Sequence, residues 1–386
     1  MDVEKIGRLK RRMEEEGVDV LILRNPENVL YVSGYWPVTG WSILVFKSTG
    51  DATLIVPESE LAFTKESWVK DVRAYPTEKL DRVWNPYEHF ERLLKEVNVP
   101  KGSKVGLELS FETVATNNVC GEVSFASVPT FKLIEKALEV SVVDVTQMLY
   151  ELRMVKTGRE IKKLRLANEI AIIGLETARE FLREGVRESE VAAECEKAIE
   201  VEGIGYKGIV RRARGFAFVM SGRNSARAWY PYNISSSRRI KRGDTVLIEL
   251  NVFADGYWSD LTRTWVVGTP TELQKDVIDV INAAIDNVVK NERGGMLASE
   301  VDKLARSVIE EMGYGRDFPH RLGHGIGVRM HEPPAIHPTS TEIVPTGAVH
   351  SVEPGIYFMD FGIRVEDDVH VLKNRVIVLS EYDRSL

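Results

Sequence analysis

The chain has 386 residues, of which 44% are hydrophobic and 28% are charged. This composition is ordinary for a globular protein of two or three domains, and it excludes a disordered, collagen-like or coiled-coil chain. The formal net charge of −7 argues against nucleic-acid binding driven by overall charge, so we expect no nucleic-acid partner.

Cysteine content and the first residues bear on location. Cys120 and Cys195 are too few for a disulfide framework or a thiolate zinc site, which favours a reducing compartment. Residues 1–5 begin an amphipathic helical pattern rather than a signal peptide. No apolar run approaches the roughly 18 residues that a membrane span needs. We therefore expect a cytoplasmic protein without a membrane partner.

Helical and strand patterns alternate over the first 150 residues. Residues 18–23 form a short apolar run typical of a buried strand, and the strand patterns at 42–47 and 52–56 flank a Gly-containing loop. A helical pattern follows at 87–97 and another strand pattern at 104–109. The alternation predicts a smaller α/β domain over residues 1–150, linker included. The sequence contains no Walker-type phosphate loop.

Residues 151–386 change character. Helical patterns at 159–182 and 189–201 precede strand patterns at 215–220, 245–253 and 257–267. The run Thr269-Pro270-Thr271-Glu272 predicts a capping box with proline at the first helical position. These patterns predict an α+β domain in which helices pack on an antiparallel sheet. The sequence shows no short-period repeat.

Histidines are concentrated late in the chain. Six of the seven lie between residues 320 and 370, in a window that also holds Glu353 and Glu366 within apolar, strand-like surroundings. A lone ionised carboxylate is costly there. The clustering predicts a functional site formed by some of His320, His324, His331, His337, His350 and His370. For the last three, a surface or satisfied core position is the simpler interpretation.

A second carboxylate pair lies upstream. Glu249 and Asp260 interrupt two apolar strand patterns, and Ala254-Asp255-Gly256 between them is a hairpin turn signal. Folding the ribbon at this turn places the two carboxylates nearly opposite each other, where like charges are destabilising unless a cation lies between them. The alternative is that one carboxylate faces solvent on the other side of the ribbon.

Four carboxylates and one imidazole form a ligand set made mostly of oxygen. Four negative charges in one cleft raise one another's pKa values, and two divalent cations would offset them. Such a set suits manganese-like or iron-like ions. Two ions about 3.5–4 Å apart share a water that deprotonates near neutral pH. Other motifs fail on spacing: His331-Glu332-Pro333-Pro334 lacks the second histidine of H-E-x-x-H, and G-x-S-x-G is absent.

The order of these motifs resembles the pita-bread metallohydrolases, which include methionine aminopeptidase, aminopeptidase P and prolidase. The resemblance rests on a carboxylate eleven residues before an aspartate, Gly-His-Gly at 323–325, Glu-Pro-Gly at 353–355 and Arg-x-Glu-Asp at 364–367. It implies a pita-bread catalytic domain over residues 151–386, with helices on a curved antiparallel sheet. Residues 1–150 are similar to the creatinase-type domain that precedes it in prolidases and aminopeptidase P.

The resemblance also implies a metal centre. Two divalent ions, manganese or cobalt, would be bound, and Asp260 and Glu366 would bridge both of them. Glu353 would in addition carry a proton from the nucleophilic water to the leaving nitrogen. The implied metal ligands are Glu249, Asp260, His324, Glu353 and Glu366.

Further roles follow from the same resemblance. His331 would hydrogen-bond the substrate near the scissile bond, His320 would line the pocket as a catalytic-site residue, and Arg364 would bind substrate or a ligand carboxylate. The implied activity is hydrolysis of the Xaa-Pro bond in dipeptides or short peptides through a metal-bridging hydroxide. The implied assembly is a homodimer in which the neighbour's amino-terminal domain closes the pocket.

Two positions depart from the family pattern. Glu249 stands where the family normally has aspartate, and Tyr232 stands where prolidases carry a substrate-binding histidine, so we expect Tyr232 at the substrate. The asparagine at position 251, two residues after Glu249, also resembles the pattern of creatinase. These departures leave open a hydrolase of a non-peptide C–N bond, like creatinase or ectoine hydrolase, or a non-catalytic relative. The Arg-rich segment 211–227 is either a carboxylate-binding wall or a solvated basic face.

Overall fold

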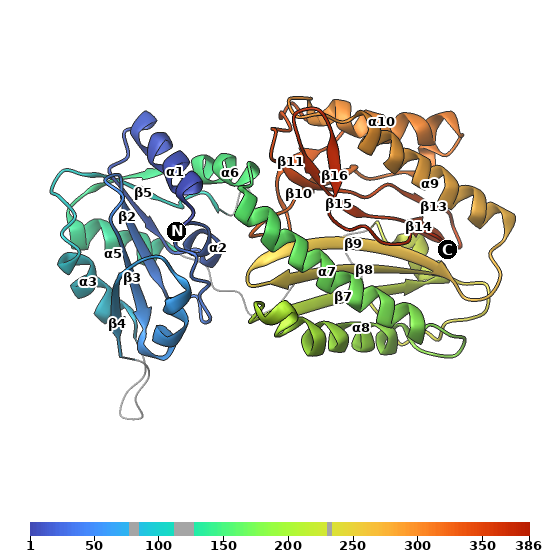
Figure 1. The fold of residues 1–386 in the computed structure, drawn as a ribbon, viewed down its shortest axis with the longest axis horizontal. Helices are drawn as coiled ribbons and strands as arrows, with labels where there is room; N and C mark the ends of the chain where they lie inside the picture. The colour runs from blue at the N-terminus through green and yellow to red at the C-terminus, as the bar shows by residue number, and fades with distance from the viewer. Residues whose placement is uncertain (77–84, 112–126, 230–233) are drawn as a thin grey trace. The chain divides into compact units, whose positions relative to one another are not determined.

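The computed structural model describes residues 1–76, 85–111, 127–229 and 234–386. Within them the chain divides into two compact units, Met1–Arg153 and Met154–Leu386 (Figure 1). The sequence-based boundary at residue 150 lies three residues before this division. Cys120 and the expected substrate residue Tyr232 lie outside the described residues.

The first unit is built on a six-stranded mixed sheet with the order β4-β3-β2-β1-β5-β6. Strand β1 is buried along its whole length and pairs antiparallel with β2 and parallel with β5. Apolar residues of α3 and α5 pack against the sheet in one core, as expected for an α/β domain. The elements are α1 (Val3–Glu15), β1 (Val20–Leu23), α2 (Pro26–Ser33), β2 (Ile43–Lys47), β3 (Ala52–Pro57), β4 (Asp71–Tyr75), α3 (Tyr87–Glu96), β5 (Lys104–Leu107), α5 (Val128–Leu138), β6 (Ser141–Asp144) and α6 (Thr146–Met154).

The second unit consists of helices on antiparallel sheets. Helices α7 and α8 pack on the sheet β7-β8-β9, and α9 and α10 pack on strands of the sheet β11-β10-β12-β15-β16 and of the pair β13-β14 (Figure 1). The elements are α7 (Gly158–Phe181), α8 (Glu188–Gly203), β7 (Ala213–Ser221), β8 (Thr245–Ala254), β9 (Tyr257–Val266), α9 (Glu272–Asn291), α10 (Ala298–Glu311), β10 (Gly323–Gly325), β11 (Glu332–Ile336), β12 (Val349–Val352), β13 (Gly355–Tyr357), β14 (Gly362–Arg364), β15 (Asp367–Val371) and β16 (Val376–Val378).

The two helix pairs of this unit repeat one design 110 residues apart. The turn between α7 and α8 contains Gly185 at φ +89°, and that between α9 and α10 contains Gly295 at φ +100°. The third residue of each second helix is a glutamate whose side chain accepts a hydrogen bond from the backbone N–H three residues earlier. These bonds measure 2.7 Å at Glu190 and 3.0 Å at Glu300. The second unit therefore has two related halves, a repeat that the sequence patterns did not reveal.

The hairpin between β8 and β9 fixes how the upstream carboxylates lie. Asp255 and Gly256 form its two-residue loop with φ values of +48° and +83°, so Ala254 pairs with Tyr257. Glu249 consequently pairs with Thr262 and Asp260 with Asn251. Glu249 and Asp260, expected to lie nearly opposite each other, are thus not a direct pair but are offset by two residues in the register. Because side chains alternate, they still share one face as diagonal neighbours.

Helix α9 begins two residues later than the predicted capping box implies. Its N-cap is Thr271, whose backbone N–H donates to Gln274 at 2.8 Å while the Thr271 hydroxyl accepts from the N–H of Gln274. Pro270 therefore precedes the cap instead of occupying the first helical position. Among the described residues, no helix has the length and apolarity required to cross a membrane.

Candidate metal centre

Both halves of the second unit contribute to one buried polar cluster. Glu249 lies on β8 and Asp260 on β9, in the first half. His324 lies on β10, Glu353 directly after β12 and Glu366 between β14 and β15, in the second half. Asp260, His324 and Glu366 are 1–3% exposed. Segments more than a hundred residues apart thus bring their polar side chains to one interior point.

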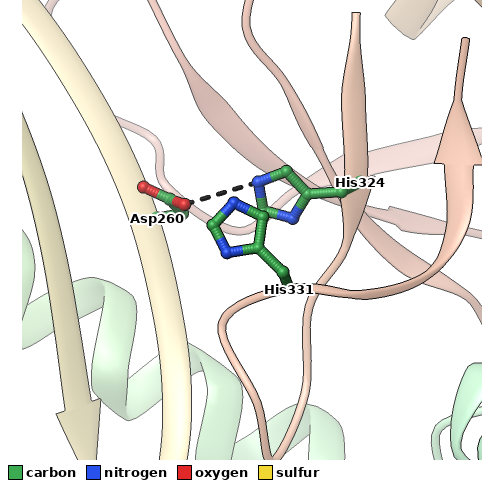
Figure 2. Close-up of side chains that lie close together, drawn as sticks. All are labelled: Asp260, His324 and His331. Carbon is green, nitrogen blue, oxygen red and sulfur yellow. Dashed lines mark ion pairs between the residues drawn. The ribbon is translucent and has the colours of Figure 1, made fainter. Parts of the chain in front are cut away.

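The distances define the centre of the cluster. His324 Nε2 lies 3.5 Å from Asp260 Oδ2 and 3.6 Å from Glu353 Oε1. Among the described residues, two sets of three side chains place candidate ligand atoms within 4.8 Å of one another: Asp260, His324 and His331, and His324, Glu353 and Glu366. Figure 2 shows both imidazole rings beside the Asp260 carboxylate. His324 belongs to both sets, so it marks the point where they meet.

Glycines allow His324 to take this position on a paired strand. A Cβ atom at Gly323 would lie 2.0 Å from the Ser351 carbonyl oxygen, and one at Gly325 would lie 2.1 Å from that of Pro333. Only glycine permits such close approach. Glycines on both sides of His324 are typical of a loop, whereas the structure shows a short strand with a bulge between His324 and Gly325.

Hydrogen bonds orient the ligand side chains. His324 Nδ1 lies 3.1 Å from the Gly325 carbonyl, which can only accept, so Nδ1 carries the hydrogen and the Nε2 lone pair faces the carboxylates. The Ser351 hydroxyl donates to Glu353 Oε1 at 3.2 Å, and the Thr262 hydroxyl donates to Glu366 Oε2 at 2.7 Å. Each of these bonds leaves other acceptor positions on the carboxylate.

Burial dominates the electrostatics of the carboxylates. It raises the pKa of Glu353 to about 8, with the Arg364 guanidinium opposing and the Asp260 charge adding to the shift. The pKa of Glu366 lies well above its ordinary value, again through burial and then through Asp260 and Glu353. Within the described part of the chain, Glu366 Oε1 is buried without a hydrogen-bond partner. A divalent cation satisfies such an acceptor and offsets the crowded charge, so the residues fit a metal ion.

The histidines of the cluster are neutral. Burial lowers the pKa values of His320 and His324 to about 3 and that of His331 well below its ordinary value. The rings of His324 and His331 lie 3.9 Å apart, centroid to centroid. A neutral imidazole can coordinate a metal through one nitrogen or donate a hydrogen bond to a substrate.

Arg364 lies at the opposite edge of the cluster and binds Glu249. Its Nη2 donates to Glu249 Oε2, its Nε donates to the Thr262 hydroxyl at 3.1 Å, and its Nη1 lies 3.4 Å from the Tyr357 hydroxyl. His320 Nε2 lies 3.1 Å from the same hydroxyl. Of the five expected ligands, Asp260, Glu353 and Glu366 therefore lie around His324, while Glu249 is absent from both three-residue sets and forms an ion pair with Arg364.

Several contacts that support the ligands were not predicted from the sequence, although Asn251 itself was singled out there. Asn251 donates to Asp260 Oδ1 at 2.5 Å, and Asp368 accepts from the Asp260 backbone N–H at 3.3 Å. Ser351 and Thr262 were missed as well, although each lies two residues from a predicted ligand. Strand alternation places such residues on the same face as the ligand, and this signal would have identified them.

The second unit has antiparallel sheets covered by helices, and carboxylates and imidazoles converge inside it. A separate α/β unit precedes it in the chain. Together these features define a metallohydrolase. The chain belongs to metallopeptidase family M24, which residues 162–373 match, while residues 5–155 match the creatinase/prolidase N-terminal domain. These matches confirm the family and fold expected from the sequence.

Similar proteins cover the whole chain. It is 33% identical to the Xaa-Pro dipeptidase of Pyrococcus furiosus over 384 residues, 99% of each chain, and 33% identical to that of Pyrococcus horikoshii over 391 residues, all of each chain. The prolidase structure from P. horikoshii has a TM-score of 0.79 at 30% identity and covers 99% of both chains. An X-Pro aminopeptidase structure from Thermotoga maritima has a TM-score of 0.79 at 28% identity and covers 99% of this chain and 98% of its own.

Proposed function

We propose that this metallopeptidase hydrolyses the Xaa-Pro bond of dipeptides or short peptides with two divalent ions. The observation that carries the proposal is the convergence of Asp260, Glu353 and Glu366 on His324. The substrate class is supported by the Xaa-Pro dipeptidases to which the chain is similar along its whole length.

The ligand set favours manganese or cobalt, because four of the five proposed ligands are carboxylates and none is a thiolate. Asp260, His324, Glu353 and Glu366 would hold the ions, with Glu249 as the fifth ligand. The ions would supply Lewis-acid chemistry, lowering the pKa of a water and polarising the substrate carbonyl.

The chain's own residues would then move protons and orient the substrate. Glu353, oriented by the Ser351 hydroxyl, would accept a proton and deliver it to the leaving nitrogen. His331, neutral and next to His324, would donate a hydrogen bond to the developing oxyanion. His320 and Arg364, which both approach the Tyr357 hydroxyl, would form the wall of the substrate pocket. On the basis of the sequence alone, we propose that Tyr232 binds the substrate.

A panel of substrates tests this function. The full chain would be stripped of metal, reloaded with Mn²⁺ or Co²⁺, and given Ala-Pro, Ala-Ala and creatine. We expect turnover of Ala-Pro only, abolished by a chelator and restored by either ion. Turnover that survives complete removal of metal, or no preference for Ala-Pro over Ala-Ala, would overturn the proposal.

A related hydrolase of a non-peptide C–N bond is the second candidate. The ion pair between Glu249 and Arg364 and the hydrogen bond from Asn251 to Asp260 favour it, because both place this chain's unusual residues at the centre. Turnover of creatine without Ala-Pro would select this function, and robust turnover of either substrate would exclude a non-catalytic relative. We further propose a cytoplasmic homodimer that binds no nucleic acid.

A further inference from the structure

A buried ion pair lies beside the metal centre and contains none of its proposed ligands. Lys156 Nζ lies 3.5 Å from Glu332 Oε1, and the two side chains are 1% and 2% exposed. Lys156 lies just before α7, and Glu332 is the first residue of β11, so the pair joins two distant segments of the second unit. A buried ion pair contributes little net stability, and its best attested use is to specify one arrangement of the chain.

Glu332 directly follows the histidine that is proposed to donate a hydrogen bond to the oxyanion. The ring of His331 lies 3.9 Å from that of His324, centroid to centroid, while the carboxylate of the next residue pairs with Lys156 (Figure 2). Adjacent residues share a peptide bond, so a change in the position of Glu332 moves the His331 backbone as well. The glutamate of this His-Glu pair, which does not fit H-E-x-x-H, is therefore placed to hold the histidine.

A glycine provides the space for the carboxylate. A Cβ atom at Gly327 would lie 1.7 Å from Glu332 Oε1 and 3.3 Å from Lys156 Cε. Any side chain at this position would push the carboxylate away from the lysine, and glycine avoids this. The carboxylate thus lies against the backbone at the start of the turn formed by residues 327–331. The ion pair holds the two ends of this turn together.

Backbone hydrogen bonds fix the first end of the turn more firmly than the second. The N–H of Ile326 donates to the Val349 carbonyl at 3.0 Å, and the N–H of Trp258 on β9 donates to the Gly327 carbonyl at 2.9 Å. At the second end, Glu332 pairs with Gly325 directly after the β-bulge between β10 and β11. A bulge disrupts the pairing of the strands locally. The side-chain pair with Lys156 supplies a further constraint at that end.

We infer that the ion pair between Lys156 and Glu332 positions the His331 imidazole for the reaction by constraining the turn of residues 327–331. Both members are positioning residues, which act through His331 and not by contact with the substrate. The inference rests on the proposed function, in which His331 donates to the oxyanion, and adds the residues that set the place of this donor. A misplacement of about 1 Å is sufficient to reduce turnover by up to about 10²-fold.

A double-mutant cycle with His331 tests the inference. Lys156→Met combined with Glu332→Gln removes both charges, keeps similar volumes and leaves no uncompensated buried charge. In the full chain loaded with Mn²⁺, this neutral pair should lower kcat on Ala-Pro by about tenfold and leave KM nearly unchanged. In a His331→Ala background the same two substitutions should lower kcat by less than about twofold, because the group that they position is absent.

A matched control and a second variant accompany the cycle. Glu194→Gln with Lys197→Met neutralises an exposed ion pair in the same way and should leave kcat unchanged. Glu332→Gln alone, in which the buried Lys156 can lose its proton, should give the same two results as the neutral pair. Circular dichroism establishes that each protein is folded before its kinetics are compared.

Nitrogen-15 NMR of the histidine rings in the metal-free protein gives a readout that does not depend on turnover. The His331 ring signals, identified by their absence in His331→Ala, should shift in the neutral pair, whereas those of His320 should not. An equal fall in kcat in both backgrounds, or unshifted His331 signals in a folded variant, would overturn the inference. A wild type that does not hydrolyse Ala-Pro would instead refute the proposed function, and the ring signals would still decide whether the ion pair positions His331.

Discussion

At the scale of single residues, burial determines the charge state of the cluster before any ion binds. It raises the pKa of Glu353 to about 8 and lowers those of His320 and His324 to about 3. In the metal-free cluster the raised pKa values favour the protonated forms of Glu353 and Glu366 and the imidazoles are neutral, while Glu249 pairs with Arg364. This explains how four carboxylates can share one interior point during folding.

The stability of the metal-free protein should fall as the pH rises from about 6.5 to about 8. In this window the folded state keeps the Glu353 proton that the unfolded state has already lost, so folding is weakened as pH rises. The buried histidines act in the opposite direction, but only below their ordinary pKa of 6.5. Thermal unfolding in chelator at several pH values measures the effect.

Glu353→Gln is the matched variant for this experiment. It removes the titrating group while keeping its shape, so the decrease in melting temperature between pH 6.5 and 8 should become smaller. A steeper decrease in the variant, or rising stability of the metal-free wild type across this window, would contradict the assignment.

His331→Ala should reduce kcat on Ala-Pro by about 10²-fold, because it removes a hydrogen-bond donor proposed for the oxyanion. Steady-state kinetics with saturating Mn²⁺ measures it, and KM should change little. His337→Ala removes an exposed histidine from the same region and should leave kcat within twofold. Equal rates for His331→Ala and wild type would exclude the proposed role.

At the scale of elements, the sequence identified the β8–β9 ribbon but not its register. The turn residues Asp255 and Gly256 were recognised, yet the pairing depends on which residues close the loop. The sequence could not show that Glu249 faces Thr262 or that Asn251 faces Asp260. Arg364 was expected to bind a ligand carboxylate or the substrate, but only the structure shows that the carboxylate is Glu249.

A buried ion pair beneath this ribbon should be important for stability. Arg263 on β9 donates to Asp367 at 2.7 Å, and both side chains are 1% exposed. Arg263→Met leaves the Asp367 charge with less compensation and should lower the free energy of unfolding by about 3–5 kcal/mol. Urea unfolding of the metal-free protein measures this. Arg223→Met, which breaks an exposed pair with Asp360, should cost less than about 1 kcal/mol, and a similar cost for both would contradict the argument.

At the scale of the whole molecule, the sequence predicted two domains and their fold classes but not the internal repeat of the second. The patterns at 159–182 and 189–201 were identified as helices, and the capping box at 269–272 predicted another. The relation between the two helix pairs was missed, although Gly-x-x-x-Ser-Glu-Val occurs at both 185–191 and 295–301, because most other side chains differ. The structure shows that both glycines adopt positive φ in the turn before the second helix.

The chain should sediment as a dimer, with twice the mass of one chain. This expectation comes from the family resemblance, and equilibrium sedimentation of the metal-loaded protein at micromolar concentration measures it. A single-chain mass under these conditions, with full activity on Ala-Pro, would show that no neighbouring subunit is needed to complete the pocket.

The division of the cluster between two halves also bears on biosynthesis. Asp260 emerges from the ribosome long before Glu353 and Glu366, and neither half of the second unit supplies the whole cluster. A nascent chain that ends before Glu353 lacks both carboxylates that lie with His324 in one of the two candidate sets. The complete cluster therefore forms only late in synthesis, after both halves of the second unit have been made.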